Sequence, residues 1–555
     1  MRGKRAAKRR APASPSKTIL AVCWAGICLI LAGLLAYYLL ASKRVAGGLG
    51  LPLDDGWIHA RFAQNLARGY GFSFNPGEPT STTTGPLWTL LLALVYRLTG
   101  EHLVSGIAAN CVLCLLLLGV VCKLSLRLIP SRWLALSAAL VVAVTVPLPW
   151  WALSGMEPPL YALLALLGIL LHIGQRDRAG WRGLAPTPVF ALAALARPEM
   201  LLLFPLSMLD RLIVALIEKR ERAGRQWLKE FAVHLPVFLA IIAPVLIYNY
   251  RVTGYLLPTS FYSKLQRVGI PGALVDPRVT WSSALAAGPA LELWEVVKVW
   301  ARDNCLLLAP FFLGVGWLVR QFVRGSGPAP RSLLIPMLVV GQPVAWALVG
   351  GYRPPDYQSQ RYIADLNPLF VLLGLAGGWW LTERLAALRR PIARTALLAA
   401  VLIASLLRQP AAANVYAMNV KNTNEMQVAI GRWLRANVPA DSLLAVNDIG
   451  AIGFITDMRV LDLQGLVTPE ILPLRDMKHR LDGTAPRAVF AFLAARRPNY
   501  LVIFPQWYPD LDQRRDLFTP VFWVAIEDNV TNGAPVMVVY RADWGAAPRR
   551  EVRAP

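Results

Sequence analysis

The chain has 555 residues, of which 56% are hydrophobic and only 16% are charged, with a mean hydropathy of +0.46 and a formal net charge of +24. This composition excludes an ordinary soluble enzyme, a disulfide scaffold and a disordered chain. Apolar runs of about 18 or more residues recur from Thr18 to Arg408, and a membrane span takes about 20 such residues. Because the runs are continuous and do not alternate, they predict a polytopic α-helical membrane protein and not an outer-membrane barrel.

Six short segments carry most of the positive charge: 1–17, 123–132, 176–182, 218–230, 320–331 and 383–394. Together they hold 25 basic and 5 acidic residues, which is +20 of the net +24. An excess of Lys and Arg in short loops marks the cytoplasmic side of a membrane protein. We therefore expect the basic charge to report topology, with all six segments on the cytoplasmic side and no nucleic-acid partner.

About eleven spans fit between these segments and form an expected transmembrane domain at 18–409. The first span follows a basic tail at 1–17 without a convincing cleavage site, which indicates an uncleaved anchor with a cytoplasmic N-terminus. Outward spans are expected near 18–41, 133–148, 184–197, 231–249, 332–350 and 393–409, and inward spans near 105–126, 159–175, 200–217, 298–319 and 366–383. An odd number of spans places the C-terminal part on the outer side.

The first outer loop, at about 42–104, is long and carries the adjacent carboxylates Asp54 and Asp55. Apolar residues then recur from Ile58 at i, i+4 and i+8, which predicts an amphipathic helix on the membrane surface. The apolar stretch 86–98 is too short to cross comfortably, so we expect a re-entrant or interfacial helix there.

After Arg408 the composition becomes that of a globular protein, and 410–555 is expected to form an extracytoplasmic α/β domain. Its expected helices are 424–437 and 488–496, and its expected strands are 443–446, 460–463, 501–504 and 535–540.

Asp54 and Asp55 are the first candidates for chemistry. Neighbouring side chains on a helix diverge by about 100°, so the two carboxylates cannot point at one atom. One interpretation makes one aspartate a general base while the other caps the helix or orients a ligand. The alternative is that both only cap the helix and interact with its dipole.

Charged residues at the outer ends of later spans are further candidates. Glu157 and Glu199 each lie where a span emerges, and ionisable residues at membrane depth are often functional. Either acid could instead pair with a nearby arginine. Lys264, Arg353 and Arg361 are cations on the outer side, where an anionic ligand such as a phosphate would explain them. Ordinary solvated loop charges would explain them too.

Several motifs are distributed along the chain. The first outer loop reads LDDGWIHARFA at 53–63, GFSFNPGE at 71–78 and GPLW at 85–88, and later segments read SGME at 154–157, ARPE at 196–199, LPTSFYSK at 257–264, DIGAIG at 448–453 and VLDLQGL at 460–466. This set resembles bacterial GT-C superfamily glycosyltransferases over nearly the whole chain. The nearest relatives suggested by the motifs are lipid-linked arabinofuranosyltransferases and related enzymes with an outer C-terminal domain.

The resemblance implies transfer of a sugar from a polyprenyl-phosphate donor to a glycan, lipid or protein acceptor on the outer face of the bacterial cytoplasmic membrane. It implies that Asp54 or Asp55 is the catalytic base and that Glu157 is the second-loop acid. Donor-phosphate contacts would come from Lys264, Arg361 and Arg353. Further site candidates are His59, Glu199 and Tyr262.

Some members of the superfamily need a divalent metal and others do not. The sequence has no clear cluster of three carboxylates, so we expect no obligatory metal or cofactor, with a divalent ion at the acidic site as the alternative. A transporter or flippase of lipid-linked sugars is the alternative function, because it would use the same cations without a base. A non-catalytic envelope scaffold is a third interpretation. Acids at the outer mouths of spans favour transfer over both.

Overall fold

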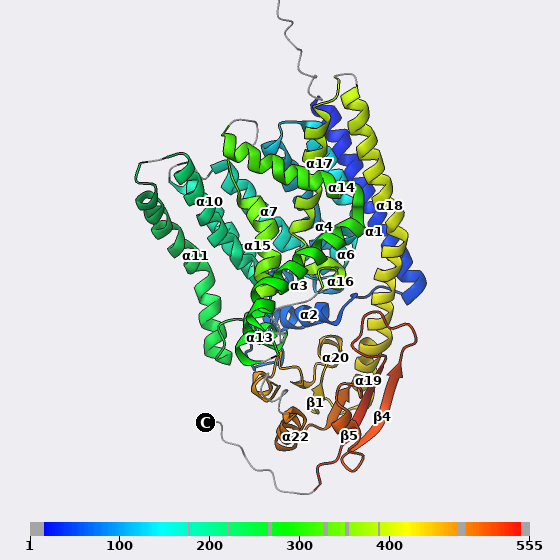
Figure 1. Cartoon of the computed structure of the whole chain (residues 1–555). Helices are drawn as coiled ribbons and strands as arrows, with labels where there is room; N and C mark the ends of the chain where they lie inside the picture. Colours follow the sequence, from blue (N-terminus) through cyan, green and yellow to red (C-terminus); the bar gives the residue numbers. More distant parts are fainter. Residues whose placement is uncertain are drawn as a thin grey trace, which may run out of the picture.

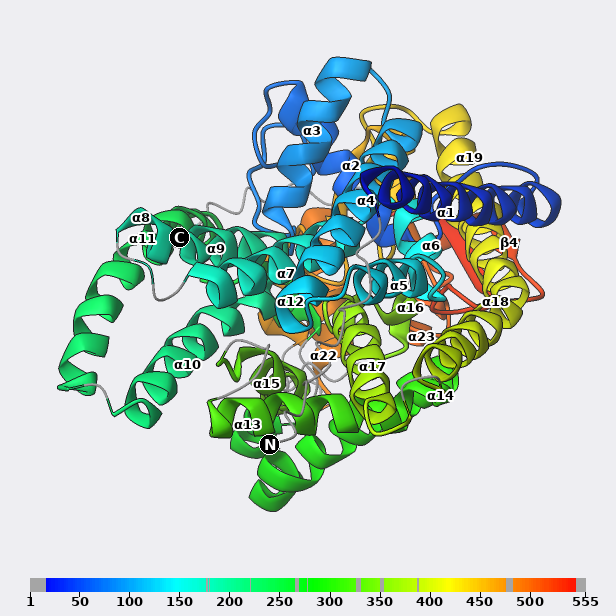
Figure 2. The same ribbon diagram turned by 90° about the horizontal axis from the view of Figure 1, so that it is seen from above.

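The computed structural model describes residues 16–545 except 176, 177, 179, 220, 265–268, 277, 326–330, 350–353, 387, 388 and 476–482. Figure 1 shows a large helical body joined at one end to a smaller unit that contains a β-sheet. Seen from above, the helices of the body stand side by side, and the smaller unit with the sheet lies beneath them (Figure 2).

Seven helical segments of the described chain are long and apolar enough to cross a membrane. They contain α1 (Lys17–Ala46), α4 (Leu103–Leu128), α7 (Pro158–Gln175), η1 with α10 (Pro198–Leu202 and Leu203–Ile217), α11 (Ala223–Thr253), α14 (Gly288–Arg324) and α18 (Arg389–Thr423). Two bent pairs raise the number to nine if each is one span: α5 with α6 (Arg132–Ala143 and Pro147–Leu153), bent by 64°, and α16 and η3 with α17 (Tyr357–Gln360, Arg361–Ile363 and Leu366–Thr382), bent by 75°.

By length and composition, nine of the eleven expected spans are therefore accounted for within the described residues, and a shorter helix lies at each of the other two positions. The two helices that fall short are α9 (Pro186–Ala196) with 11 residues and α15 (Leu334–Val349) with 16 residues. At 1.5 Å per residue they reach only about 17 and 24 Å, which is less than a hydrocarbon core of about 30 Å. Apolar composition alone could not reveal these lengths.

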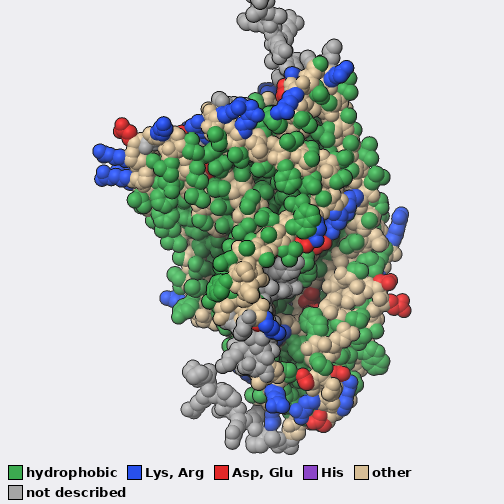
Figure 3. Space-filling model, in the orientation of Figure 1, with side chains coloured by type: hydrophobic (Ala, Val, Ile, Leu, Met, Phe, Trp, Pro, Cys, Tyr) green, Lys and Arg blue, Asp and Glu red, His purple; other side chains and the backbone are tan. Residues whose placement is uncertain are grey.

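Shorter helices connect the long ones. They are α2 (Asp54–Ala67), α3 (Pro86–Thr99), α8 (Trp181–Leu184), α12 (Thr259–Lys264), α13 (Gly269–Val275) and η2 (Ser283–Ala287). A wide apolar surface covers the helical body, and Lys and Arg side chains gather at the end farthest from the sheet (Figure 3). The turns between α10 and α11 and between α17 and α18, which belong to the basic segments, lie at this end in Figure 1.

The smaller unit is built around a five-stranded mixed sheet in the order β2-β1-β3-β5-β4. Its strands are β1 (Leu443–Val446), β2 (Arg459–Asp462), β3 (Tyr500–Ile503), β4 (Phe518–Ala525) and β5 (Val536–Ala542). Its helical elements are η4 and α19 (Asn424–Val428 and Ala429–Asn437), α20 (Gly450–Thr456), η5 and η6 (Pro469–Ile471 and Pro473–Arg475), α22 (Ala485–Arg496) and α23 (Pro509–Asp512). β1 pairs in parallel with β2 and β3, whereas β5 pairs antiparallel with β3 and β4.

The four expected strands are confirmed to within two residues, and β4 was missed. β4 is an edge strand that is mostly exposed and contains Pro520, so its sequence lacks the buried alternation that signals a strand. The expected boundary at 409/410 falls inside α18, which continues from the helical body into the smaller unit.

α2 lies between the helical body and the sheet unit (Figure 1). Its residues Ile58 and Phe62 pack in one apolar cluster with Phe74, Met426 and Ile452, while Leu66, the third residue of the stripe, packs against the core of the helical body, so the stripe is buried within the protein. The expectation that this stripe lies on the membrane surface is therefore wrong. An amphipathic pattern reports that one face is buried, but it does not distinguish lipid from a neighbouring domain.

Candidate active site

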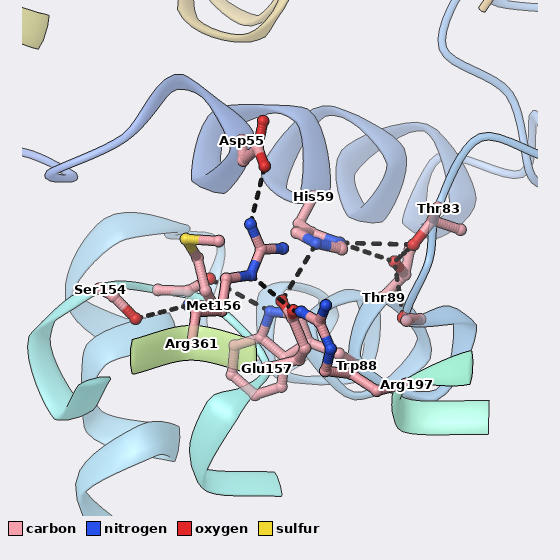
Figure 4. Close-up of polar contacts among 12 residues, drawn as sticks. Asp55, His59, Thr83, Trp88, Thr89, Ser154, Met156, Glu157, Arg197 and Arg361 are labelled. Carbon is pink, nitrogen blue, oxygen red and sulfur yellow. Dashed lines mark hydrogen bonds and ion pairs between the residues drawn. The ribbon is translucent and has the colours of Figure 1, made fainter. Parts of the chain in front are cut away.

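A network of charged side chains joins three segments that are distant in sequence (Figure 4). Asp55 lies in the first turn of α2, Glu157 directly precedes α7, and Arg361 begins η3. The Arg361 guanidinium bridges the two acids, because Nη1 donates to Asp55 Oδ2 at 2.7 Å and Nε donates to Glu157 Oε1 at 2.8 Å. Two acids and a cation singled out from the sequence thus meet in one place.

Glu157 is completely buried and surrounded by positive charge. Besides Arg361, the guanidinium of Arg197 donates to Oε1, and His59 Nε2 lies 3.4 Å from Oε2. A buried carboxylate held by two guanidinium groups stays ionised, so it is a poor proton donor. The geometry therefore favours a positioning role for Glu157, in which it fixes the two arginines.

Asp55 is the more accessible carboxylate of the network. Its side chain is 24% exposed, and Oδ2 lies 3.3 Å from Lys264 Nζ as well as beside Arg361. Burial alone would raise the pKa of Asp55, but the charges of Lys264 and Arg361 outweigh it and hold the pKa below its ordinary value of 3.8. Asp55 is therefore a carboxylate at neutral pH, with two expected phosphate-binding cations next to it.

Asp54 does not join this network. Its two oxygens accept hydrogen bonds from the backbone N–H groups of Gly450 and Ala451, at 2.7 and 2.8 Å, at the start of α20. A Cβ on Gly450 would lie 2.1 Å from the Asp54 carbonyl oxygen, so this approach requires glycine. Burial, followed by the neighbouring carboxylate of Asp448, raises the pKa of Asp54 to about 8. Asp54 thus links the first loop to the C-terminal unit, and the geometry favours Asp55 as the base.

Glu199 forms a bidentate ion pair. The Nε and Nη2 atoms of Arg197 donate to its two oxygens at 3.0 and 2.6 Å, and the same guanidinium lies 4.5 Å from the centre of the Tyr362 ring. Pairing with an arginine was the alternative open for Glu199, and the structure has that pair. Because Arg197 also binds Glu157, it connects Glu199 to the network.

His59 lies at the edge of the network. Its Nδ1 is 3.4 Å from the hydroxyl oxygens of both Thr83 and Thr89, while its Nε2 faces Glu157. Thr83, which precedes α3, and Thr89, which lies in α3, thereby orient the imidazole, and Figure 4 shows this arrangement.

Two other candidates are not placed in the network. The Tyr262 ring packs against the rings of Tyr255 and Phe261, with centroid distances of 4.6 and 5.4 Å. Arg353 lies outside the residues that the structure describes.

Sequence reasoning missed the residues that support Arg361. The Tyr161 hydroxyl donates to the Arg361 carbonyl oxygen at 2.6 Å, although Tyr161 lies in an apolar span and carries no motif signal. The three residues before Arg361, at 358–360, have φ values of 51°, 54° and 63°, a left-handed conformation that is costly for residues other than glycine. Such strain is typical of functional sites, and no sequence pattern reported it.

A cavity of about 420 Å³ adjoins the network. Its charged lining consists of Arg197, Glu199, Lys264, Arg361 and Glu292. The remaining lining is mostly apolar and includes Leu201, Leu202, Leu257, Phe261 and Val349. The cavity therefore suits a molecule with an anionic group at one end and an apolar body.

The described residues do not fit a divalent metal. Within them, no three His, Cys, Asp or Glu side chains converge in a way that could hold an ion. The carboxylates of Asp55 and Glu157 are engaged by Lys and Arg side chains, which compete with a cation for the same oxygens.

Comparison with known proteins gives the fold. A family described as a domain of unknown function (DUF8728) matches residues 414–547, and no curated protein sequence matches the chain. The structure of ArnT from Cupriavidus metallidurans bound to undecaprenyl phosphate is similar with a TM-score of 0.57 and 12% identity, over 96% of this chain and 100% of that one. The Archaeoglobus fulgidus oligosaccharyltransferase in the apo form has a TM-score of 0.54 and 13% identity, over 89% of this chain and 73% of that one.

The chain has the GT-C fold. A third similar structure, archaeal oligosaccharyltransferase AglB from Archaeoglobus fulgidus with an inhibitory peptide and a dolichol-phosphate, covers 93% of this chain and 75% of that one at a TM-score of 0.52 and 12% identity. In the GT-C fold of this chain, the charged network lies where the first loop meets the ends of the helical body.

Proposed function

We propose that the protein is a glycosyltransferase that moves a sugar from a polyprenyl-phosphate donor to an envelope acceptor at the outer surface of the bacterial cytoplasmic membrane. The observation that carries the proposal is the contact of Asp55 with Lys264 and Arg361 beside a largely apolar cavity. The site thereby combines a base, two cations that suit a phosphate and an apolar cavity that suits a lipid. ArnT, which has the same fold, is described with undecaprenyl phosphate bound.

The chemistry follows from these contacts. Asp55 accepts the proton of an acceptor hydroxyl, whose oxygen attacks the anomeric carbon of the donor sugar. The bond from that carbon to the phosphate oxygen breaks, and the negative charge that develops on the leaving polyprenyl phosphate is stabilised by Lys264 and Arg361. Glu157 and Arg197 hold Arg361 in position.

Donor binding should also change the pKa of Asp55. In the structure Asp55 forms ion pairs with Lys264 and Arg361, the two cations that a phosphate would bind. Their positive charges lower the pKa of Asp55 and make it a weak base. A bound donor phosphate competes for Lys264 and Arg361 and neutralises their charge. The pKa of Asp55 then rises toward its ordinary value, so the base becomes effective when the donor is in place.

A transfer assay tests the proposal. Purified protein is incubated with a panel of polyprenyl-phosphate sugars and envelope acceptors, and products are sought by mass spectrometry, with Asp55→Asn as the inactive control and the exposed Asp510→Asn as the matched active control. A product that depends on Asp55 supports the proposal. If no panel member yields product while the protein moves a lipid-linked sugar across a liposome bilayer, the function is that of a flippase.

A further inference from the structure

One wall of the cavity carries a buried acid that the proposed reaction does not use. Glu292, near the start of α14, lines the cavity and is only 3% exposed. Its Oε2 atom has no hydrogen-bond partner among the residues that the structure describes. Glu295, three residues later on the same helix, is instead 22% exposed and pairs with Lys298 at 2.6 Å. Glu292 is therefore not an ordinary solvated or paired carboxylate.

Two polar side chains of α15 line the same cavity. The Gln342 amide nitrogen donates to the Tyr362 carbonyl oxygen at 3.2 Å and to Asp365 Oδ1 at 3.1 Å, which fixes the amide and leaves its Oε1 without a partner within the described chain. Trp346, one turn further along, has a buried indole N–H that is also unpaired there. Glu292, Gln342 and Trp346 thus line the cavity, and each carries one buried side-chain atom without a partner in the described chain: two acceptors and one donor.

Buried polar groups without partners are costly, so a ligand that reaches these three atoms and pairs with them is favoured. The parts of a polyprenyl-phosphate sugar differ in this respect. The prenyl chain has no hydrogen-bonding groups, and the phosphate diester only accepts hydrogen bonds, so it cannot pair with the two acceptors. Only sugar hydroxyls both donate and accept.

We infer that Glu292, Gln342 and Trp346 form the subsite that binds the hydroxyl groups of the donor sugar. The inference rests on the proposed function, because it assumes that the cavity receives a lipid-linked sugar. A site built to hydrogen-bond a hydroxyl discriminates strongly against a ligand that lacks it, since its own groups are then left unpaired. The three residues therefore select the donor sugar, while Lys264 and Arg361 bind the phosphate that all such donors share.

Comparing two lipids tests the subsite. Binding of undecaprenyl phosphate without a sugar, and of the undecaprenyl-phosphoryl sugar that the parent binds best, is measured by native mass spectrometry for the parent and for Glu292→Leu, Glu292→Gln and Trp346→Phe. We expect Glu292→Leu to weaken binding of the sugar-linked lipid about tenfold or more while binding of undecaprenyl phosphate stays within about twofold. Trp346→Phe, which removes the indole N–H and puts a smaller ring in its place, should show a smaller loss in the same direction. Glu295→Gln is the matched control and should change neither.

The outcomes separate the two proposals. A parent protein that binds no sugar-linked lipid contradicts the proposed function and the subsite with it. A parent that binds the lipid, together with variants that bind it equally well, contradicts only the subsite. Equal loss of both lipids in the folded variants assigns Glu292 to the phosphate or the prenyl chain and also overturns the inference. If Glu292→Leu fails to fold, Glu292→Gln and Trp346→Phe decide between these results.

Discussion

Asp54 and Asp55 are neighbours on one helix, yet Asp54 binds the backbone of the C-terminal unit while Asp55 binds cations of the helical body. Their divergence by about 100° on a helix allows one aspartate to fasten the domains and the other to face the proposed reaction.

This division predicts different effects of the same substitution. Asp55→Asn keeps the shape of the side chain but cannot accept a proton, so we expect transfer to fall by about 10²- to 10⁴-fold. Asp54→Asn keeps only one of two acceptors for Gly450 and Ala451, so it should lower stability by about 1 kcal/mol and reduce transfer only in part. Rates and thermal melting of both variants check this. Parent rates in both would exclude a catalytic role for the pair.

Lys264 should govern donor affinity. Lys264→Met removes a charge that is 35% exposed and contacts Asp55, and because charge-assisted contacts are worth about 1.5–3 kcal/mol, we expect donor binding to weaken by about tenfold or more. Lys298→Met makes the same change on α14, away from the network, and should leave affinity unaltered. The affinity of each variant for the lipid donor is measured directly. Equal affinity in the two variants would show that Lys264 does not contribute to donor binding.

Glu157 should matter for stability as well as for activity. Glu157→Gln removes the fully buried carboxylate that binds both Arg197 and Arg361, so that Arg197 keeps only Glu199 and Arg361 keeps only Asp55. Removing one partner of a buried ion pair costs about 3–5 kcal/mol. Glu383→Gln removes a carboxylate whose side chain is 48% exposed and which pairs with Arg390 and Arg394 at the surface, so it should alter Tm little. Thermal unfolding in detergent distinguishes them. A Glu157→Gln protein that melts with the parent would contradict the positioning role.

The pH dependence of activity should respond to Lys264. The pKa of Asp55 is lowered in the folded protein, so its ion pairs contribute stability above the ordinary pKa of 3.8 and lose it as the pH falls through the lowered value. Lys264→Met removes one of the charges that lower this pKa. The acid limb of kcat/KM against pH should therefore move to higher pH in the variant. An acid limb that stays in place would show that Lys264 does not act on Asp55.

Topology is open to a direct test. Since Lys and Arg gather at the end of the helical body away from the sheet, reporter fusions or cysteine labelling should place residues near Arg225 and Arg390 inside and residues near Ser73 and Asp510 outside. A cytoplasmic location for Asp510 would contradict the expected topology and a role of the C-terminal unit in a reaction on the outer side.

The sequence predicted the helices, four strands and most charged residues of the network because composition, periodicity and motifs are local signals. It could not predict that Asp54 binds Gly450, which lies 396 residues away, or that Arg197 binds Glu157 as well as its sequence neighbour Glu199. Those contacts depend on how helices pack. It also could not separate α9 and α15 from full spans, because their ends are set by packing and not by hydropathy.

The continuity of α18 determines how the two parts of the molecule can move. Because the helix passes from the body into η4 and α19 without a loop, the C-terminal unit cannot swing freely on a linker. We therefore expect the contact between α2 and the C-terminal unit to persist during the proposed reaction. We therefore expect donor and product to exchange in the proposed reaction without an opening and closing movement of the C-terminal unit.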